Sequence, residues 1–196
     1  MLKKIFEQII IFFAWTFAQL RSVKKTKHTH CSYCGKKYVS EKWPRSCNKC
    51  KNITWRNPLP VIVLLVPTGA GLLLVRRGNS PACGELALPG GYVDWDEDWR
   101  TGTRELLEET GIKIDASKLE LLEILNSPSN STNIHSHMLI FARTPPVALS
   151  ALENFRPNDE VTELEVHYDP IDLVFKTHSA MMKRFFGVKH LKIASR

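Results

Sequence analysis

The sequence predicts a mixed α/β (α+β) domain behind a small four-cysteine zinc ribbon and an apolar N-terminal helix. Three observations carry this prediction: apolar runs of strand length outnumber helical stretches after residue 58, two Cys-x-x-Cys pairs precede them, and a continuous apolar segment lies near the start. The 196 residues suffice for one domain of ordinary size and a small appendage. The 43% hydrophobic and 24% charged residues exclude a disordered or fibrous chain. We therefore predict three segments, 1–27, 28–57 and 58–196.

Charge is distributed unevenly along the chain. Residues 1–58 contain 13 Lys and Arg against two acidic residues, whereas residues 59–196 contain 14 against 18. The net charge of the second part does not attract phosphate groups, so we expect cations to mediate phosphate binding there.

The N-terminal segment contains an apolar core over residues 9–18, broken only by Thr16. Ten residues are too few to cross a bilayer, which takes about 20. Basic residues precede the core, but no clear cleavage site follows it, which disfavours secretion. Two interpretations stay open: a helix lying in a membrane interface, and a helix packing on the rest of the protein or on a partner subunit. We expect a cytoplasmic protein, with peripheral membrane contact through residues 1–20 as the alternative.

Four of the five cysteines form two pairs at metal-ligand spacing, namely Cys31 with Cys34 and Cys47 with Cys50. Two such pairs supply four thiolates for one tetrahedral ion, and the bound ion would supply folding energy to a segment with little apolar content. Disulfides or a redox centre are the alternatives, but the lysine-rich surroundings favour a structural Zn²⁺. Basic residues alternate with Tyr and Trp in this segment. A solvated surface is the favoured interpretation of them, and RNA binding is the alternative.

The third segment is predicted to mix strands and helices, with strands in the majority. In chain order, we predict a buried hairpin over 61–66 and 72–75, a short strand at 86–88 before a glycine turn, a helix over 100–110, strands over 119–125, 137–143 and 162–167, and a closing helix over 178–186. The first helix should end at Gly111, because glycine readily adopts the left-handed conformation of a C-cap.

The predicted helix over 100–110 carries three glutamates, Glu105, Glu108 and Glu109. Their i, i+3, i+4 spacing places all three carboxylates on one helical face. Such carboxylates repel one another unless a hard divalent cation neutralises them, and their crowding raises the pKa of at least one. The helix follows a Gly-Gly turn, so the pattern favours a Mg²⁺ or Mn²⁺ phosphate site and a reaction fastest at alkaline pH. A solvated acidic helix is the alternative.

The residues from 89 to 112 resemble the Nudix box, G-x5-E-x7-R-E-U-x-E-E-x-G-U with U aliphatic. The second half matches at every fixed position, namely Arg104, Glu105, Leu106, Glu108, Glu109, Gly111 and Ile112. The first half departs from the pattern. Counting from Gly90 puts Asp96 where the box has glutamate, whereas counting from Gly91 reaches Glu97 and leaves six residues before Arg104.

The resemblance implies a Nudix-type α/β/α sandwich with a mixed sheet. It also implies divalent-metal-dependent hydrolysis of a diphosphate linkage in a nucleoside diphosphate derivative, such as NADH or ADP-ribose. By analogy with the family, Glu105, Glu108 and Glu109 bind Mg²⁺ or Mn²⁺, and Arg104 orients a glutamate through an ion pair. The analogy further implies contacts to the cofactor from Gly90, Gly91, Asp96 or Glu97, and a further ligand or base from Glu160 or Glu163.

The sequence leaves the substrate and the exact function open. The order of zinc ribbon and Nudix domain is similar to the NADH pyrophosphatase branch, but the SQPWPFP-type signature of that branch is absent after the box. The second hypothesis for the function is a catalytically weak Nudix-fold ligand sensor or RNA-binding regulatory protein. The aromatic candidates for substrate contact are Trp95, Trp99, His135 and His137, with packing the favoured role of the two tryptophans.

Overall fold

The computed structural model describes residues 28–127 and 136–187. The chain divides into two compact units, with the boundary between Arg56 and Asn57. The expected N-terminal helix within 1–27, and His135, lie outside the described ranges. Within these ranges, none of the helices is long and apolar enough to cross a membrane.

The first unit is built from two loops of the same design. Strands β1 (Arg45–Ser46) and β2 (Ile53–Thr54) pair antiparallel. In each loop, the first cysteine of the pair accepts a hydrogen bond from the amide four residues later: Gly35 N to Cys31 O and Lys51 N to Cys47 O, both 2.9 Å. Gly35 and Lys51 both adopt positive φ, at 70° and 64°, which lets each loop turn back toward its cysteines.

The second unit contains a mixed four-stranded sheet in the order β7-β3-β9-β8. These strands are β3 (Leu59–Leu65), β7 (Gly90–Tyr92), β8 (Glu120–Ser127) and β9 (His137–Arg143). Strands β3 and β9 run parallel, and the other pairs are antiparallel. Strand β9 has the predicted bounds, and β8 is shifted by no more than two residues.

A second, antiparallel sheet contains β10 (Val161–His167), β5 (Gly71–Arg77), β4 (Pro67–Thr68) and β6 (Leu86–Ala87), the last also pairing with β5. The predicted hairpin of 61–66 with 72–75 is wrong in its pairing. Only the two residues of β4 and one further bond, Leu73 N to Val66 O at 3.0 Å, connect this segment with β5. Strand β3 pairs with β7 and β9 instead, because the chain changes sheets after Leu65.

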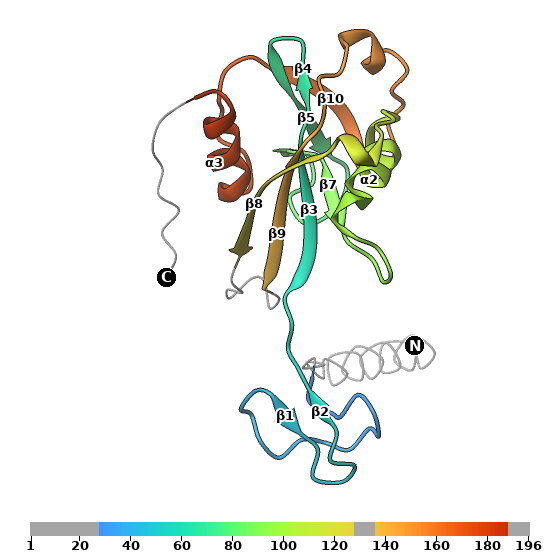
Figure 1. The fold of residues 1–196 in the computed structure, drawn as a ribbon, viewed down its shortest axis with the longest axis vertical. Helices are drawn as coiled ribbons and strands as arrows, with labels where there is room; N and C mark the ends of the chain where they lie inside the picture. Colours follow the sequence, from blue (N-terminus) through green and yellow to red (C-terminus); the bar gives the residue numbers. More distant parts are fainter. Residues whose placement is uncertain (1–27, 128–135, 188–196) are drawn as a thin grey trace, which may run out of the picture. The chain divides into compact units, whose positions relative to one another are not determined.

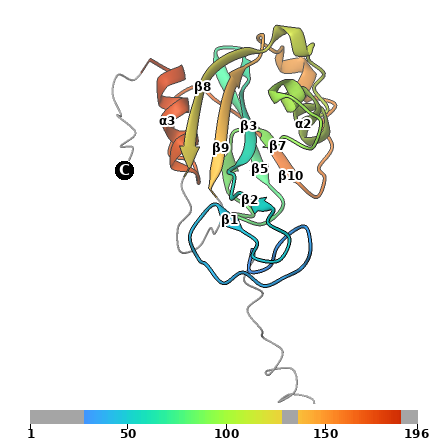
Figure 2. The ribbon, with the colours of Figure 1, turned by 60° about the horizontal axis from the view of Figure 1, so that its bottom comes forward.

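Two helices cover the strands on opposite sides (Figures 1 and 2). They are α2 (Gly102–Thr110), which follows a 3-10 turn at Trp99–Thr101, and α3 (Lys176–Phe185); further 3-10 turns occur at Ala116–Lys118 and Leu149–Leu152. Helix α2 ends at Gly111, whose φ of 76° confirms the predicted C-cap.

The apolar run of β3 is continuous because both of its faces are buried. Ile62 and Leu64 pack in the core beneath α2, which contributes Leu106. Val63 and Leu65 pack in the core beneath α3. A strand buried on both faces cannot alternate between polar and apolar residues. The predicted α/β class, with a mixed sheet between helices, is confirmed.

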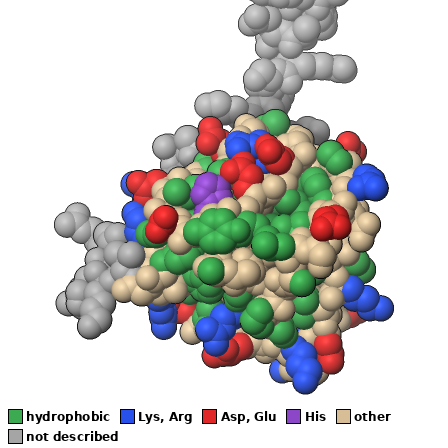
Figure 3. All heavy atoms as spheres, turned by 90° about the horizontal axis from the view of Figure 1, so that it is seen from above, with side chains coloured by type: hydrophobic (Ala, Val, Ile, Leu, Met, Phe, Trp, Pro, Cys, Tyr) green, Lys and Arg blue, Asp and Glu red, His purple; other side chains and the backbone are tan. Residues whose placement is uncertain are grey.

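On the face drawn in Figure 3, a band of apolar side chains crosses the centre, and basic and acidic side chains are interspersed around it. Mixed charge of this kind creates no strong field of one sign. Recognition of a phosphate group there would depend on a local arrangement of side chains.

Candidate active site

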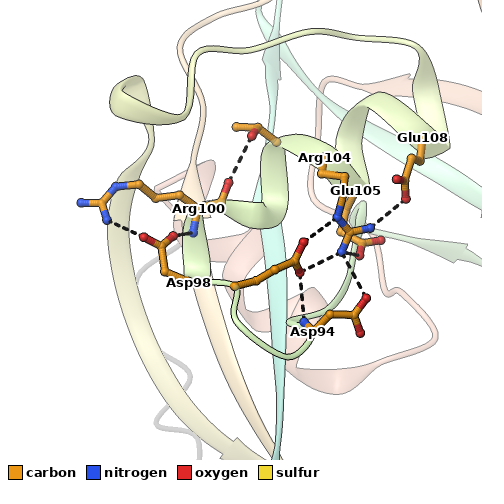
Figure 4. Close-up of polar contacts among 8 residues, drawn as sticks. Asp94, Asp98, Arg100, Arg104, Glu105 and Glu108 are labelled. Atoms are coloured by element: carbon orange, nitrogen blue, oxygen red, sulfur yellow. Dashed lines mark hydrogen bonds and ion pairs between the residues drawn. The ribbon is translucent and has the colours of Figure 1, made fainter.

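Arg104 on α2 is the centre of an acidic cluster (Figure 4). Its Nη1 lies 2.9 Å from Glu108 Oε2, and its Nη2 lies 2.9 Å from Glu105 Oε1 and 3.7 Å from Asp94 Oδ2. A planar guanidinium can serve several carboxylates at once, because its donors point in fixed, divergent directions. The structure thus brings Arg104 into contact with Glu105 and Glu108, and an ion pair of Arg104 with a glutamate is what the resemblance implied.

Glu97, and not Asp96, is the partner of Arg104 from the turn before the helix. Its two oxygens accept from Arg104 Nε at 2.9 Å and Nη2 at 3.0 Å. Hydrogen bonds from Arg104 and from the amide of Asp94 lower the pKa of Glu97 to about 2. Asp96 is exposed, with a φ of 67°, and makes no ion pair among the described residues. The ion pair therefore favours Glu97 over Asp96 as the counterpart of the box glutamate.

Gly90 and Gly91 are required by two different close approaches. A Cβ on Gly90 would lie 2.1 Å from the carbonyl oxygen of Ile62, and the φ of Gly90 is 147°. A Cβ on Gly91 would lie 2.2 Å from Glu105 Oε2. The amide of Gly90 also donates to Glu109 Oε2 at 2.9 Å. Gly90 therefore lets strand β3 approach closely and binds the carboxylate of Glu109, and Gly91 leaves room for the carboxylate of Glu105.

Glu105 and Glu109 are buried carboxylates, with 8% and 6% of their surface exposed. Burial, reinforced by the charges of Glu105 and Glu160, raises the pKa of Glu109 to about 8. Burial also raises the pKa of Glu105, and the nearby Arg104 opposes this shift. Desolvation disfavours a charged carboxylate, so both groups favour the approach of a cation.

The structure separates the two acids that the sequence proposed beyond the box. Glu160 lies close enough to Glu105 and Glu109 for its charge to raise the pKa of both. Glu163 lies on β10, where its Oε2 accepts from Arg76 Nε at 3.0 Å. Leu164, its neighbour in sequence, packs in the core beneath α2. Of the two candidates, Glu160 belongs to the acidic cluster.

Two residues of this region were missed by the sequence reasoning. The positive charge of Arg77, the last residue of β5, opposes the raised pKa of Glu109. The side chain of Asn158 bonds to the end of α2 and to the amide of Glu160. No motif marks either residue, because Arg77 ends a strand and Asn158 lies in a loop, and both are far from the box in the sequence.

The aromatic candidates lie in different environments. Trp95 is 91% exposed, so the expected packing role does not apply to it. Trp99 packs against the core beneath α2. The ring nitrogen Nε2 of His137 lies 3.3 Å from the hydroxyl of Tyr92.

The donor set of the acidic cluster fits a hard divalent cation, because it consists of carboxylates, two of them buried. Arg104 binds the carboxylates of Glu105 and Glu108, whereas the amide of Gly90 binds that of Glu109. These contacts keep the carboxylate oxygens of the cluster apart. Among the residues described, only Cys31, Cys34, Cys47 and Cys50 bring their ligand atoms within 4.8 Å of one another. The sulfurs of Cys31 and Cys50, and those of Cys34 and Cys47, lie 3.6 Å apart. This cluster fits the tetrahedral thiolate set that Zn²⁺ prefers.

Comparison with known proteins agrees with the fold and the acidic helix. The family model described as the NUDIX domain matches residues 56–186, about two thirds of the chain. A curated relative, an ADP-ribose pyrophosphatase of Methanocaldococcus jannaschii, is 32% identical over 108 residues. That alignment covers 55% of this chain and 62% of the relative.

Solved structures show the same fold. A NUDIX hydrolase from Nitrosomonas europaea superposes with a TM-score of 0.60 at 23% identity, covering 81% of this chain and 90% of that one. A bifunctional NMN adenylyltransferase/ADP ribose pyrophosphatase from Francisella tularensis superposes with a TM-score of 0.57 at 19% identity, covering 68% of this chain and 42% of that one.

Proposed function

The chain belongs to the NUDIX domain family, as its box predicted, and from this premise we propose that it hydrolyses the diphosphate linkage of a nucleoside diphosphate derivative. The observation that carries the proposal is the cluster around Arg104, which joins Glu105 and Glu108 of helix α2 to Glu97 from the turn before it. An acidic helix without a ligand would keep its carboxylates in water, because burying a charge is costly, whereas Glu105 and Glu109 are buried.

We assign Glu105, Glu108 and Glu109 as the residues that would hold Mg²⁺ or Mn²⁺. Such an ion, when bound, neutralises charge on the diphosphate oxygens and lowers the pKa of water. Glu108 is the most exposed of the three and would turn away from Arg104 to join the others. Glu97 would keep Arg104 in place during this rotation, since its two bonds to the guanidinium are independent of Glu108.

Glu160 is assigned as the base that takes a proton from the attacking water, in preference to Glu163. Its side chain is exposed, whereas Glu163 is engaged by Arg76. Water attacks one phosphorus, the bridging P–O bond breaks, and each product retains a phosphate group. Arg77, beside the cluster, supplies a positive charge suited to a substrate phosphate.

ADP-ribose is the substrate we place first, because the curated relative bears that activity in its name. NADH stays second, on the order of ribbon and Nudix domain. Phosphate release should be measured with ADP-ribose, NADH, FAD, dinucleoside polyphosphates and nucleoside triphosphates, using Mg²⁺ or Mn²⁺ and a coupled phosphatase.

Glu108→Gln tests whether the turnover belongs to this site. It removes one carboxylate from an exposed position, so the fold should persist, and we expect turnover to fall at least about 100-fold. Glu153→Gln is the matched control, because Glu153 is an exposed acid at the end of a 3-10 turn and makes no ion pair in the part of the chain that the structure describes. Turnover that persists in Glu108→Gln would reject the assignment.

A four-cysteine structural zinc in the first unit is part of the proposal. The convergence of the four sulfurs and the repeated backbone pattern of the two loops support it. Four thiolates complete a tetrahedral shell, which leaves no coordination position for catalysis.

RNA binding by the first unit is the second candidate function. Tyr33 and Trp55 are 65% and 62% exposed, in a segment rich in lysine. Exposed aromatic rings among basic residues can stack on unpaired bases. Titration of the chain with fluorescent single-stranded RNA at several salt concentrations tests this. Binding that weakens steeply with salt and is lost in Tyr33→Ala/Trp55→Ala would support it, and salt-independent or absent binding would reject it.

A further inference from the structure

The side chain of Asn158 connects the end of helix α2 with the loop that carries Glu160. Its Nδ2 donates to the carbonyl oxygens of Glu108 at 3.2 Å and Glu109 at 3.3 Å. Its Oδ1 accepts from the amides of Glu160 at 2.9 Å and Val161 at 2.8 Å. One amide group thus bonds to two elements that are about fifty residues apart in the sequence.

The helical end of this connection is a place where hydrogen-bond acceptors lack partners. The last four carbonyls of an α-helix have no amide of their own helix to accept from. Helix α2 ends at Thr110, so Glu108 and Glu109 belong to its last turn. Asn158 therefore occupies acceptors on the residues that we assign to the metal.

The backbone of Glu160 is held from a second direction as well. The amide of Gly78 donates to Glu160 O at 2.7 Å. A Cβ on Gly78 would lie 2.6 Å from Asp159 O, so the two segments are in close backbone contact. The backbone of Glu160 is fixed on both sides, while its side chain is exposed.

We propose that Asn158 is a positioning residue that holds Glu160 in register with the box glutamates of α2. This inference rests on the proposed hydrolysis, in which Glu160 is the base. Asn158 is itself exposed, so we ascribe its contribution to these bonds. A base that is misplaced by about 1 Å relative to the attacked phosphorus can cost about 100-fold in rate.

A double-mutant cycle tests the proposal through its coupling to Glu160. Asn158→Ala should lower kcat about 10- to 100-fold, with KM changed less than about twofold. In the Glu160→Gln background, the same substitution should change kcat less than about twofold, because there is no base left to position. An equal loss of kcat in both backgrounds would overturn the proposal.

Two further variants separate the helix link from the loop. Asn158→Asp keeps an acceptor for the amides of Glu160 and Val161 but loses the donors to α2, so we expect a loss of kcat at least as large as in Asn158→Ala. Wild-type kcat in Asn158→Asp would overturn the proposal. Asn154→Ala is the matched control, since Asn154 is exposed four residues earlier and makes no side-chain hydrogen bond in the part of the chain described.

Amide hydrogen exchange gives a readout that does not need turnover. In Asn158→Ala, the amides of Glu160 and Val161 should exchange faster, while those of β9 stay as in the wild type. Unchanged exchange at Glu160 and Val161 would overturn the positioning role. If the wild type hydrolyses no substrate, the proposed function fails, and faster exchange would still support the link between Asn158 and Glu160.

Discussion

Arg104 and Glu97 form a two-point ion pair, with Nε to Oε1 at 2.9 Å and Nη2 to Oε2 at 3.0 Å. The pair joins the turn before α2 to the face of the helix that carries the box glutamates. It also identifies which acid of the turn faces the helix, since Asp96, one residue earlier, is exposed and has positive φ. Six residues between the acid and the arginine therefore suffice for the contact.

Glu97→Gln should lower kcat/KM about 10- to 100-fold, because Arg104 would lose a charged partner and shift toward Glu105 and Glu108. Asp96→Asn is the matched control, and its activity should stay within about twofold of the wild type. The two steady-state measurements use the same substrate and metal. Equal losses in both variants would contradict the assignment of Glu97.

Gly91→Ala should displace the carboxylate of Glu105, because the new Cβ would lie 2.2 Å from its Oε2. We expect Mg²⁺ to bind about 10- to 100-fold more weakly, as is typical when a metal ligand loses its support. Isothermal titration calorimetry measures the affinity, and circular dichroism checks that the fold persists. Wild-type affinity in a folded variant would count against a role of Glu105 in metal binding.

Binding of Mg²⁺ should strengthen as pH rises from 6 to 8. Burial raises the pKa of Glu109 to about 8, so the carboxyl keeps its proton at lower pH and must lose it to bind a cation. The affinity should change by up to about tenfold per pH unit below 8. Calorimetry in two buffers of different ionisation enthalpy should detect the released proton, and Glu109→Gln should abolish this release. Affinity that is flat across this range would disprove the titration of Glu109.

The stability of the second unit should fall as pH decreases from 6.5 to 5. Burial lowers the pKa of His178 to about 3, and its Nδ1 accepts from the amide of Leu88 at 3.2 Å. Because the folded pKa lies below the unfolded value of 6.5, the unfolded chain takes up a proton that the folded chain excludes. The slope contributed by this residue is up to about 1.4 kcal/mol per pH unit. Urea unfolding at both pH values should show a smaller decrease in His178→Gln; an identical decrease would reject the assignment.

The first unit should contain one zinc per chain. Elemental analysis of the purified protein, followed by colorimetric detection of the released metal, measures the content. Cys31→Ser should release the metal, because it removes one of four converging thiolates. Cys83→Ser should keep it, since Cys83 is an exposed cysteine of the second unit. A metal-free wild type purified without chelators would reject the zinc site.

Much of the fold could be predicted from local pattern. Strand β9 and the end of α2 at Gly111 follow from apolar runs and from glycine chemistry, both of which depend on neighbouring residues alone. The partner of β3 could not be predicted. An apolar run shows that a strand is buried, but many partners satisfy that condition. Strand β3 pairs with β9, more than seventy residues later, and not with β5, which follows it closely in the sequence.

In the candidate site, too, local geometry could be predicted from the sequence, but contacts between separate segments could not. The spacing of the box glutamates predicted their common face, because helical geometry is regular. The preference for Glu97 over Asp96 depends on a turn in which Asp96 has positive φ, and the spacing alone left both open. Likewise, Glu160 and Glu163 are both glutamates of one acidic stretch, and they are separated by contacts that the sequence does not show: Arg76 pairs with Glu163, whereas the charge of Glu160 acts on Glu105 and Glu109.

Leu88 and Gly90 donate their amides in opposite directions, to His178 on α3 and to Glu109 on α2. The three residues from Leu88 to Gly90 therefore connect the candidate active site on α2 with the apolar core beneath α3. A substitution here that altered the reaction would also disturb a helix that takes no part in it. New substrate preferences should accordingly arise by changes at exposed loop positions, such as the side chain of Trp95, which can vary without loosening the core.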